Sequence, residues 1–302
     1  MVNHVINWLG NLCIQIVNII DQGDIIMLKK TIQLIKGNPF IIMFYMIYLA
    51  ITILFMVLIY PKSFGVGSYT QNGIFDYSLY LTTVRNMLIV LLLIFITSLF
   101  YISGFCNMIR EAIFTGKTRA SSFISGIKIY FGRVCLFVLL TIVIVIFYSV
   151  LVGMLSIPFT IMAATKGTIS IYAMILVIML ATLILVLIPS PFIVLWLPAL
   201  FLEDTGVILS LKLGAKAGVK NYGRLITSTF LLILPQTVYT ILSYKLIMKG
   251  TFYSTGYYIL LGVMAVFGLI YNVYLFVVYH EYRVRLITIQ QQQESNINPS
   301  LE

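Results

Sequence analysis

Four basic residues recur at four-residue spacing in the second half of the chain: Lys212, Lys216, Lys220 and Arg224. Residues four apart lie on the same face of a helix, so the spacing predicts one cationic stripe. Such a stripe could recruit a cytoplasmic partner. The simpler interpretation is a row of long side chains that anchors the helix on anionic lipid headgroups.

A related pattern lies upstream. The stretch Gly126–Arg133 (GIKIYFGR) is a near copy of Gly218–Arg224 (GVKNYGR), and each copy leads directly into an apolar run. Lys36, Lys128 and Lys220 are separated by 92 residues each. This regularity predicts a threefold repeat. The candidate lipid- or partner-binding residues of the two clear copies are Lys128, Arg133, Lys212, Lys216, Lys220 and Arg224.

Three polar residues of the predicted membrane spans are candidates for a site: Ser190, between Pro189 and Pro191, and the more distant Gln236 and Asn272. Polar groups at membrane depth must find partners, so Gln236 and Asn272 could line a substrate path or form hydrogen bonds between helices. Ser190 could mark a broken helix whose carbonyls face a ligand, or a plain proline kink.

The usual parts of an active site are missing. The sequence has no His-Glu-x-x-His pair, no Gly-x-Ser-x-Gly elbow and no nucleotide-binding glycine loop, and it contains 2 histidines. Arg110 and Glu111 could form a site, but we interpret them as an interfacial ion pair. Glu203-Asp204 suggests a turn that caps the next helix, with cation binding as the alternative. We therefore expect no enzyme activity, no cofactor and no metal site.

The composition is that of a membrane protein. Of 302 residues, 61% are hydrophobic and 9% are charged, and the mean hydropathy is +1.06, whereas soluble domains carry about 25% charged residues. The formal charge of +10 fits basic cytoplasmic loops that meet anionic lipid better than it fits nucleic-acid binding. We expect a multi-pass protein of the cell membrane.

Apolar periodicity and length predict how the chain is divided. An amphipathic helix at residues 3–22 precedes the repeats, and a disordered tail occupies residues 290–302. Short interfacial helices are predicted at residues 24–37 and 118–133, with a third in the lysine-rich stretch. Pro61–Thr83 is expected to be an external loop. Six spans follow from the apolar runs, at about residues 39–60, 85–105, 134–158, 169–201, 225–244 and 257–280. The fourth is too long for one crossing, so we expect a break near Pro189–Pro191.

The predicted fold class is all-α: six transmembrane helices in three parallel hairpin repeats, each preceded by a cytoplasmic interfacial helix. One membrane domain, residues 1–289, contains the repeats at approximately residues 24–110, 111–205 and 206–289. Gly218 and Gly223 are expected to let the chain turn into a span. Both termini are placed in the cytoplasm, because fourteen of the 19 Lys and Arg residues lie on that side. The other five are Lys62, Arg85, Lys166, Lys245 and Lys249.

One segment carries a family resemblance. Leu197–Asp204 (LPALFLED) is followed by Gly206, a lysine-bearing helix and Asn221–Arg224 (NYGR). This arrangement resembles bacterial six-span membrane proteins of uncharacterised function, including the membrane domain that accompanies some glycerophosphodiester phosphodiesterases. The resemblance implies the six-span fold. It does not imply the phosphodiesterase activity, because the catalytic domain with its acidic metal site is not among these residues.

These features favour a non-enzymatic membrane protein that binds lipid or a membrane partner through basic cytoplasmic helices. The main alternative is a transport or export subunit with a substrate path near the kinked fourth span. An intramembrane enzyme is a third and weaker hypothesis, because the acid, base and metal groups that it would need are missing.

Overall fold

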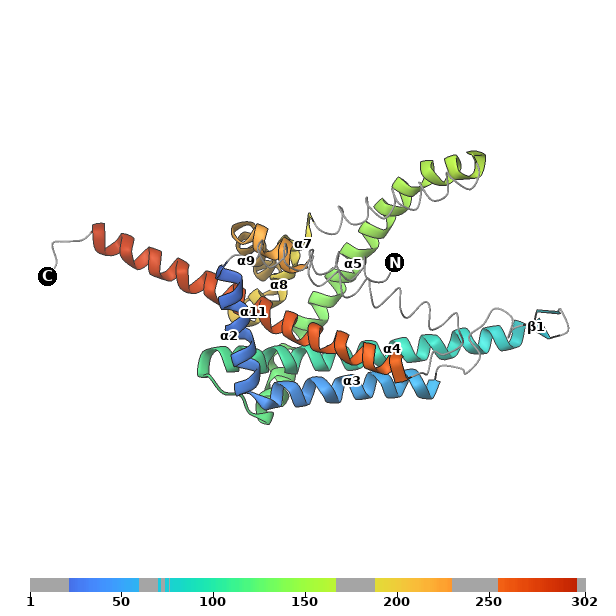
Figure 1. Cartoon of the computed structure of the whole chain (residues 1–302), viewed down its shortest axis with the longest axis horizontal. Helices are drawn as coiled ribbons and strands as arrows, with labels where there is room; N and C mark the ends of the chain where they lie inside the picture. Colours follow the sequence, from blue (N-terminus) through green and yellow to red (C-terminus); the bar gives the residue numbers. More distant parts are fainter. Residues whose placement is uncertain are drawn as a thin grey trace, which may run out of the picture. The chain divides into compact units, whose positions relative to one another are not determined.

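The computed structural model describes residues 22–59, 70–71, 74–75, 77–166, 188–229 and 255–297. In these ranges the chain is almost entirely helical (Figure 1). The helices with defined ends are α2 (Gln22–Gly37), α3 (Pro39–Ile59), α4 (Tyr77–Thr115), α5 (Ala120–Lys166), α7 (Ser190–Val194), α8 (Trp196–Leu202), α9 (Val207–Lys220) and α11 (Thr255–Ile297). Residues 222–229 are also helical. The predicted helix at residues 3–22 lies almost wholly outside the described residues, as do Gln236, the predicted fifth span beyond residue 229 and the end of the tail.

Among the described residues, three helices are long and apolar enough to cross a membrane: Tyr80–Thr115 in α4, Ala120–Leu151 in α5 and Gly262–Gln292 in α11. A fourth is added if Ile25–Gly37 and Pro39–Phe55, which are bent at the break between them, count as one broken span. By helix length and hydropathy the chain is therefore a candidate multi-pass membrane protein. The six spans and the threefold repeat remain predictions.

The chain forms two compact units, and the first of them is Gly37–Cys135. Here α3 lies alongside α4 (Figure 1). Tyr48 and Tyr101 stack across the pair with ring centroids 4.0 Å apart, and the Tyr48 hydroxyl lies 2.8 Å from Ser98 Oγ. The outer faces of α3 and α4 leave large apolar side chains exposed, such as Leu88, which is 62% exposed. Exposed apolar faces of this size suit contact with lipid acyl chains.

The second unit contains Met1–Lys36 and Leu136–Glu302. Helix α9 packs on both α7 and α8, and α11 contacts α8 and α9. Two ion pairs fasten other segments to α11: Lys30 of α2 binds Glu281, and Glu203 of the α8–α9 turn binds Arg283. The part of α11 from Val273 to Tyr279 is buried. Helix α11 is thus the element around which this unit is built.

The second predicted joint is absent. An interfacial helix at residues 118–133 and a span from Val134 were expected to be separate, yet α5 runs without interruption from Ala120 to Lys166. Gly132 has nothing within 4 Å of where a Cβ would be, so no neighbouring chain forces a bend there. A single glycine costs a helix only about 1 kcal/mol. Flanking apolar residues compensate for that cost, and the helix continues.

The other two joints are present. Asn38 separates α2 from α3, and Pro39 opens α3, where its missing N–H would have no helical partner in any case. Asn221 ends α9, and the helical residues 222–229 follow it. Gly218 does not turn the chain, because it lies inside α9. Gly223 lies within the helical residues 222–229.

Prolines shape the described end of the predicted fourth span. Pro189 lies in a turn before α7, at the place where a break was predicted, and residues 167–187 of this span and of the loop before it lie outside the described residues. A break at Leu195 separates α7 from α8. Pro198 explains it: proline has no N–H to donate to the carbonyl four residues back, which belongs to Val194, and its ring crowds that carbonyl.

The predicted external loop Pro61–Thr83 is shorter than expected at its second end. Helix α4 already begins at Tyr77, and two short antiparallel strands, β1 (Thr70–Gln71) and β2 (Ile74–Phe75), precede it. At its other end α4 extends ten residues beyond the predicted limit of Phe105, to Thr115. This extension carries Arg110 and Glu111 on a rigid helix.

Candidate functional site

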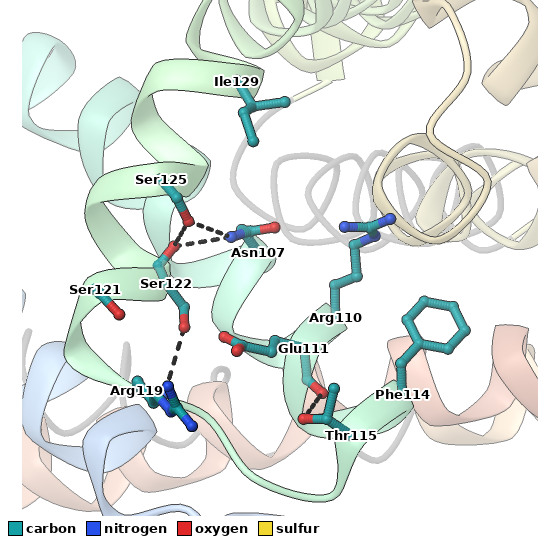
Figure 2. A pocket seen from close by; sticks show the side chains of 10 residues that line it. All are labelled: Asn107, Arg110, Glu111, Phe114, Thr115, Arg119, Ser121, Ser122, Ser125 and Ile129. Carbon is teal, nitrogen blue, oxygen red and sulfur yellow. Dashed lines mark hydrogen bonds between the residues drawn. The ribbon is translucent and has the colours of Figure 1, made fainter.

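A polar hollow in the first unit lies where α4 ends and α5 begins (Figure 2). We call it the hairpin cavity; its volume is about 710 Å³. This volume lies within the roughly 300–1,000 Å³ range of small-molecule sites. The lining residues are Asn107, Arg110, Glu111, Phe114, Thr115, Arg119, Ser121, Ser122, Ser125 and Ile129.

Close packing of the two helices fixes the wall of the hairpin cavity. A Cβ on Gly126 would lie 2.5 Å from Asn107 Cβ and 2.7 Å from the Ser103 carbonyl oxygen. Only glycine permits this approach. The approach brings Asn107 Nδ2 within 2.8 Å of the Ser122 carbonyl and within 3.3 Å of Ser125 Oγ. The buried amide therefore locks the first turns of α5 against α4.

The turn between the helices is tied down from α3. Asn38 is 2% exposed, its Oδ1 accepts a hydrogen bond from Thr118 N at 2.7 Å, and its Nδ2 donates to the Gly116 carbonyl at 3.4 Å. Gly116 has a φ of +76°, in the left-handed region that glycine adopts at little cost. The turn that joins the two helices of the cavity is therefore held in place by Asn38.

The ionic groups in the hairpin cavity do not pair with one another. Arg110 and Glu111 were predicted to form an ion pair, and they do not. Neighbouring side chains on a helix project about 100° apart, so adjacent residues face different ways. The guanidinium of Arg110 instead lies over the ring of Phe114, 5.7 Å from its centroid. Within the described ranges, the buried Arg110 Nε has no hydrogen-bond partner.

Arg119 and Glu111 complete the charged lining. Arg119 is exposed at the start of α5, and its backbone N donates to Ser122 Oγ at 3.3 Å. The side chain of Glu111 has one described hydrogen bond, which it accepts from Thr118 Oγ1 at 3.5 Å. Figure 2 shows these groups around one hollow, with α4 supplying Glu111 and Arg110 and α5 supplying the serines. Two guanidinium groups and one carboxylate therefore line the same space.

A second, smaller hollow lies in the other unit, and we call it the α11 cavity. Its volume is about 250 Å³. Its cations are Lys220, Arg224 and Arg285, and its carboxylate, Glu281, is already paired with Lys30. The Tyr282 hydroxyl is buried, and the described part of the chain offers it no hydrogen-bond partner. The remaining lining residues are Met27, Asn221, Val278, Leu286 and Ile289.

The predicted binding residues are therefore divided. Lys220 and Arg224 line the α11 cavity, whereas Lys212 and Lys216 are exposed along α9 and line neither cavity. The other two positions differ in their surroundings: Lys128 is exposed on α5, and the guanidinium of Arg133 lies 5.5 Å from the centroid of the Tyr130 ring. The sequence did not single out Asn107, Arg119 or the serines as site residues, because no spacing rule links a helix end to the start of the next helix.

The candidate transport residues are not brought together in the described part of the chain. Asn272 is exposed on α11, and its Nδ2 donates to the Gly268 carbonyl of its own helix at 2.7 Å, not to another helix. Ser190 is half-buried at the start of α7, and Gln236 lies outside the described residues. Neither cavity is lined by Ser190 or Asn272.

Glu203 and Asp204 form the predicted turn, but their side chains do not cap the helix that follows it. Glu203 accepts a hydrogen bond from the Tyr279 hydroxyl at 3.0 Å and binds Arg283. Helix α9 begins after Gly206 without a side-chain cap. Asp204 has a φ of +51°, a left-handed conformation that Asp tolerates in tight turns. In the described ranges, no group of three His, Cys, Asp or Glu residues could hold a metal ion.

Comparisons with protein-family models, with curated proteins and with solved structures find no match. The resemblance to the membrane domain associated with phosphodiesterases consequently stays a hypothesis. What the fold defines is a helical protein with three candidate membrane spans, or four if the bent pair is one span.

Proposed function

We propose that the chain is a membrane protein that binds phospholipid headgroups at its basic helix ends. The hairpin cavity carries this proposal. It opens at the connection between two candidate spans, so its depth corresponds to the membrane surface. Among the described residues, no carboxylate forms an ion pair with Arg110 or Arg119 of its lining. The proposed orientation places this connection, and both chain termini, on the cytoplasmic side.

The chemistry of the lining suits a phosphate group. A guanidinium forms paired, charge-assisted hydrogen bonds with phosphate oxygens, and Arg110 and Arg119 approach the hairpin cavity from different helices. The serine hydroxyls and the Asn107 amide add neutral polar groups beside them. Phe114 and Ile129 provide apolar surface at the same cavity, which matches the glycerol and the first methylenes of a lipid.

The α11 cavity supports the same function in a smaller form. Lys220, Arg224 and Arg285 give it a cationic lining once Glu281 is neutralised by Lys30. At about 250 Å³ it is below the usual size of a small-molecule pocket, so we expect it to take one phosphate group and not a whole headgroup. The exposed lysines of α9 would add attraction to an anionic surface, about 1 kcal/mol each.

The test is lipid retention by the full chain. After purification in mild detergent and delipidation, phospholipid is titrated back and bound lipids are counted by native mass spectrometry. Removing both charges in Arg110→Gln/Arg119→Gln should weaken the tighter binding event by at least about tenfold, since a hydrogen bond to a charged group contributes about 1.5–3 kcal/mol. Arg224→Gln/Arg285→Gln should remove a second, separate binding event.

Matched controls separate these sites from general charge. Lys117→Gln removes a cation from the same turn without touching the hairpin cavity lining, and Lys216→Gln does the same on α9. Both should keep the two separate binding events, and Lys216→Gln should lose only the general attraction of one exposed lysine, about 1 kcal/mol. Equal lipid binding by the unchanged chain and the double arginine variants would overturn the proposal, provided that the helical circular dichroism of the variants is unchanged.

A further inference from the structure

We infer that the hairpin cavity selects a zwitterionic headgroup that carries a primary ammonium beside its phosphate, as phosphoethanolamine does. This inference rests on the proposed function and deepens it. It starts from Glu111, which a site for simple anions would not need. A carboxylate in the lining repels a phosphate, so its presence beside two arginines calls for a ligand with both signs of charge.

The carboxylate of Glu111 is available to a ligand. In the part of the chain that the structure describes, it forms no ion pair, and its one side-chain hydrogen bond, from Thr118 Oγ1, is long at 3.5 Å. The side chain is half-buried, so an ammonium bound there would lose part of its water and need replacement acceptors. Ser121, Ser122 and Ser125 place hydroxyl oxygens along the same lining, and a primary ammonium has three N–H donors to share among them.

A quaternary ammonium fits the hairpin cavity less well. It has no N–H to donate, and it is bound best over aromatic faces. The aromatic ring of the lining, Phe114, already has the Arg110 guanidinium over it at 5.7 Å from the centroid. The lining therefore favours a primary amine over choline.

The α11 cavity provides an internal comparison. Its carboxylate, Glu281, is paired with Lys30 of α2. The charged groups that the α11 cavity offers to a ligand are therefore its cations, Lys220, Arg224 and Arg285. The hairpin cavity has no such lysine. The two sites should therefore differ in selectivity: the α11 cavity should accept phosphate groups whatever they are attached to, and the hairpin cavity should require the ammonium as well.

The experiment is a competition between lipids. The delipidated full chain is mixed with equimolar phosphatidylethanolamine, phosphatidylglycerol and phosphatidylcholine of matched acyl chains, and retained lipids are quantified by native mass spectrometry. The unchanged chain should retain phosphatidylethanolamine about fivefold over the other two, as expected for one partly exposed ion pair. Glu111→Gln should abolish that preference with little change in total lipid. Glu111→Lys should invert it toward phosphatidylglycerol.

Asp204→Asn is the matched control, because it removes the same charge at a site outside both cavities and keeps a residue that tolerates left-handed φ. It should keep the preference. No preference in the unchanged chain, or an unchanged preference in both Glu111 variants, would overturn the inference. Loss of total lipid in the double arginine variant would at the same time leave the proposed function intact, so the two failures are distinguishable.

A competition with the free headgroup shows whether the zwitterion is a membrane lipid or a soluble molecule. Millimolar free phosphoethanolamine should fail to displace the retained phosphatidylethanolamine, because the acyl chains add apolar contact that the free headgroup lacks. Complete displacement would overturn the assignment to a membrane lipid.

Discussion

The α-carbon of Gly218 lies so close to α7 that no side chain fits there. A Cβ built at this position would lie 1.9 Å from the Pro191 carbonyl oxygen. We predict that Gly218→Ala lowers the free energy of unfolding by about 1–3 kcal/mol, because α9 must move away from α7. Thermal unfolding in detergent measures the change. Gly223→Ala, which has nothing within 4 Å of its added Cβ, should be neutral or slightly stabilising, and an equal loss in both variants would contradict the close-packing account.

Trp196 holds α8 and α9 together through its indole N–H. The side chain is 0% exposed, and Nε1 donates to the Val207 carbonyl at 2.8 Å and to Ser210 Oγ at 3.1 Å. Trp196→Phe should therefore cost about 1–3 kcal/mol in the free energy of unfolding, since it removes these hydrogen bonds and leaves a small void. Denaturant or thermal unfolding measures it. Tyr222→Phe, which loses one longer bond to Ile188 O at 3.3 Å, should change stability by less than about 0.5 kcal/mol.

At the scale of single residues, sequence patterns identified important positions but predicted the wrong role for some of them. Gly218 stood out by its repetition, and it is important for packing inside a helix, not for turning the chain. Conformational freedom and missing volume are both properties of glycine, and only the neighbouring backbone decides which one is used. For Glu111 the misreading had another cause: adjacent opposite charges suggested a pair, although helix geometry separates neighbouring side chains.

Among the elements, the α4–α5 turn depends on Asn38, the residue between α2 and α3. Its side chain satisfies the buried Thr118 N–H of the α4–α5 turn. We predict that Asn38→Ala costs about 1–3 kcal/mol, because that N–H is left unsatisfied, and that hydrogen exchange at residues 116–119 becomes faster. Asn272→Ala serves as the comparison. The side chain of Asn272 is exposed and its amide donates to a carbonyl of the same helix, so stability and hydrogen exchange should stay unchanged. Unaltered exchange in Asn38→Ala would contradict the role of this residue.

Helix ends marked by proline or asparagine could be predicted, and the others could not. Pro39 and the Pro189–Pro191 stretch predicted helix boundaries. In the structure, α3 begins at Pro39 and Pro189 lies in a turn before α7. The break at Leu195 is caused by Pro198, three residues later, and its position follows from which carbonyl the ring crowds. The junction at Gly132-Arg133 has no proline or asparagine, and α5 passes through it without a break. The hairpin cavity could not be predicted at all, because it exists only where the packing of α4 against α5 brings two helix ends together.

For the whole molecule, the predicted topology is tested by finding on which side of the membrane each helix end lies. In a chain without its three native cysteines, we predict that a cysteine at position 117, in the α4–α5 turn, reacts with an impermeant maleimide only from the cytoplasmic side. A cysteine replacing Tyr77, which is 65% exposed at the start of α4, should react only from outside. Labelling of both positions from one side would show that α4 does not cross the membrane.

Helix α4 is longer than a bilayer needs. Its 39 residues extend about 58 Å at 1.5 Å per residue, against a hydrocarbon core of about 30 Å. It has the hairpin cavity at one end and the β1–β2 turn near the other. An unbroken helix is stiff, so its two ends move together when it tilts. A tilt of about 10° over this length would displace one end sideways by about 10 Å relative to the other. A headgroup that draws the cavity toward the lipid surface would consequently shift the β1–β2 turn on the opposite face.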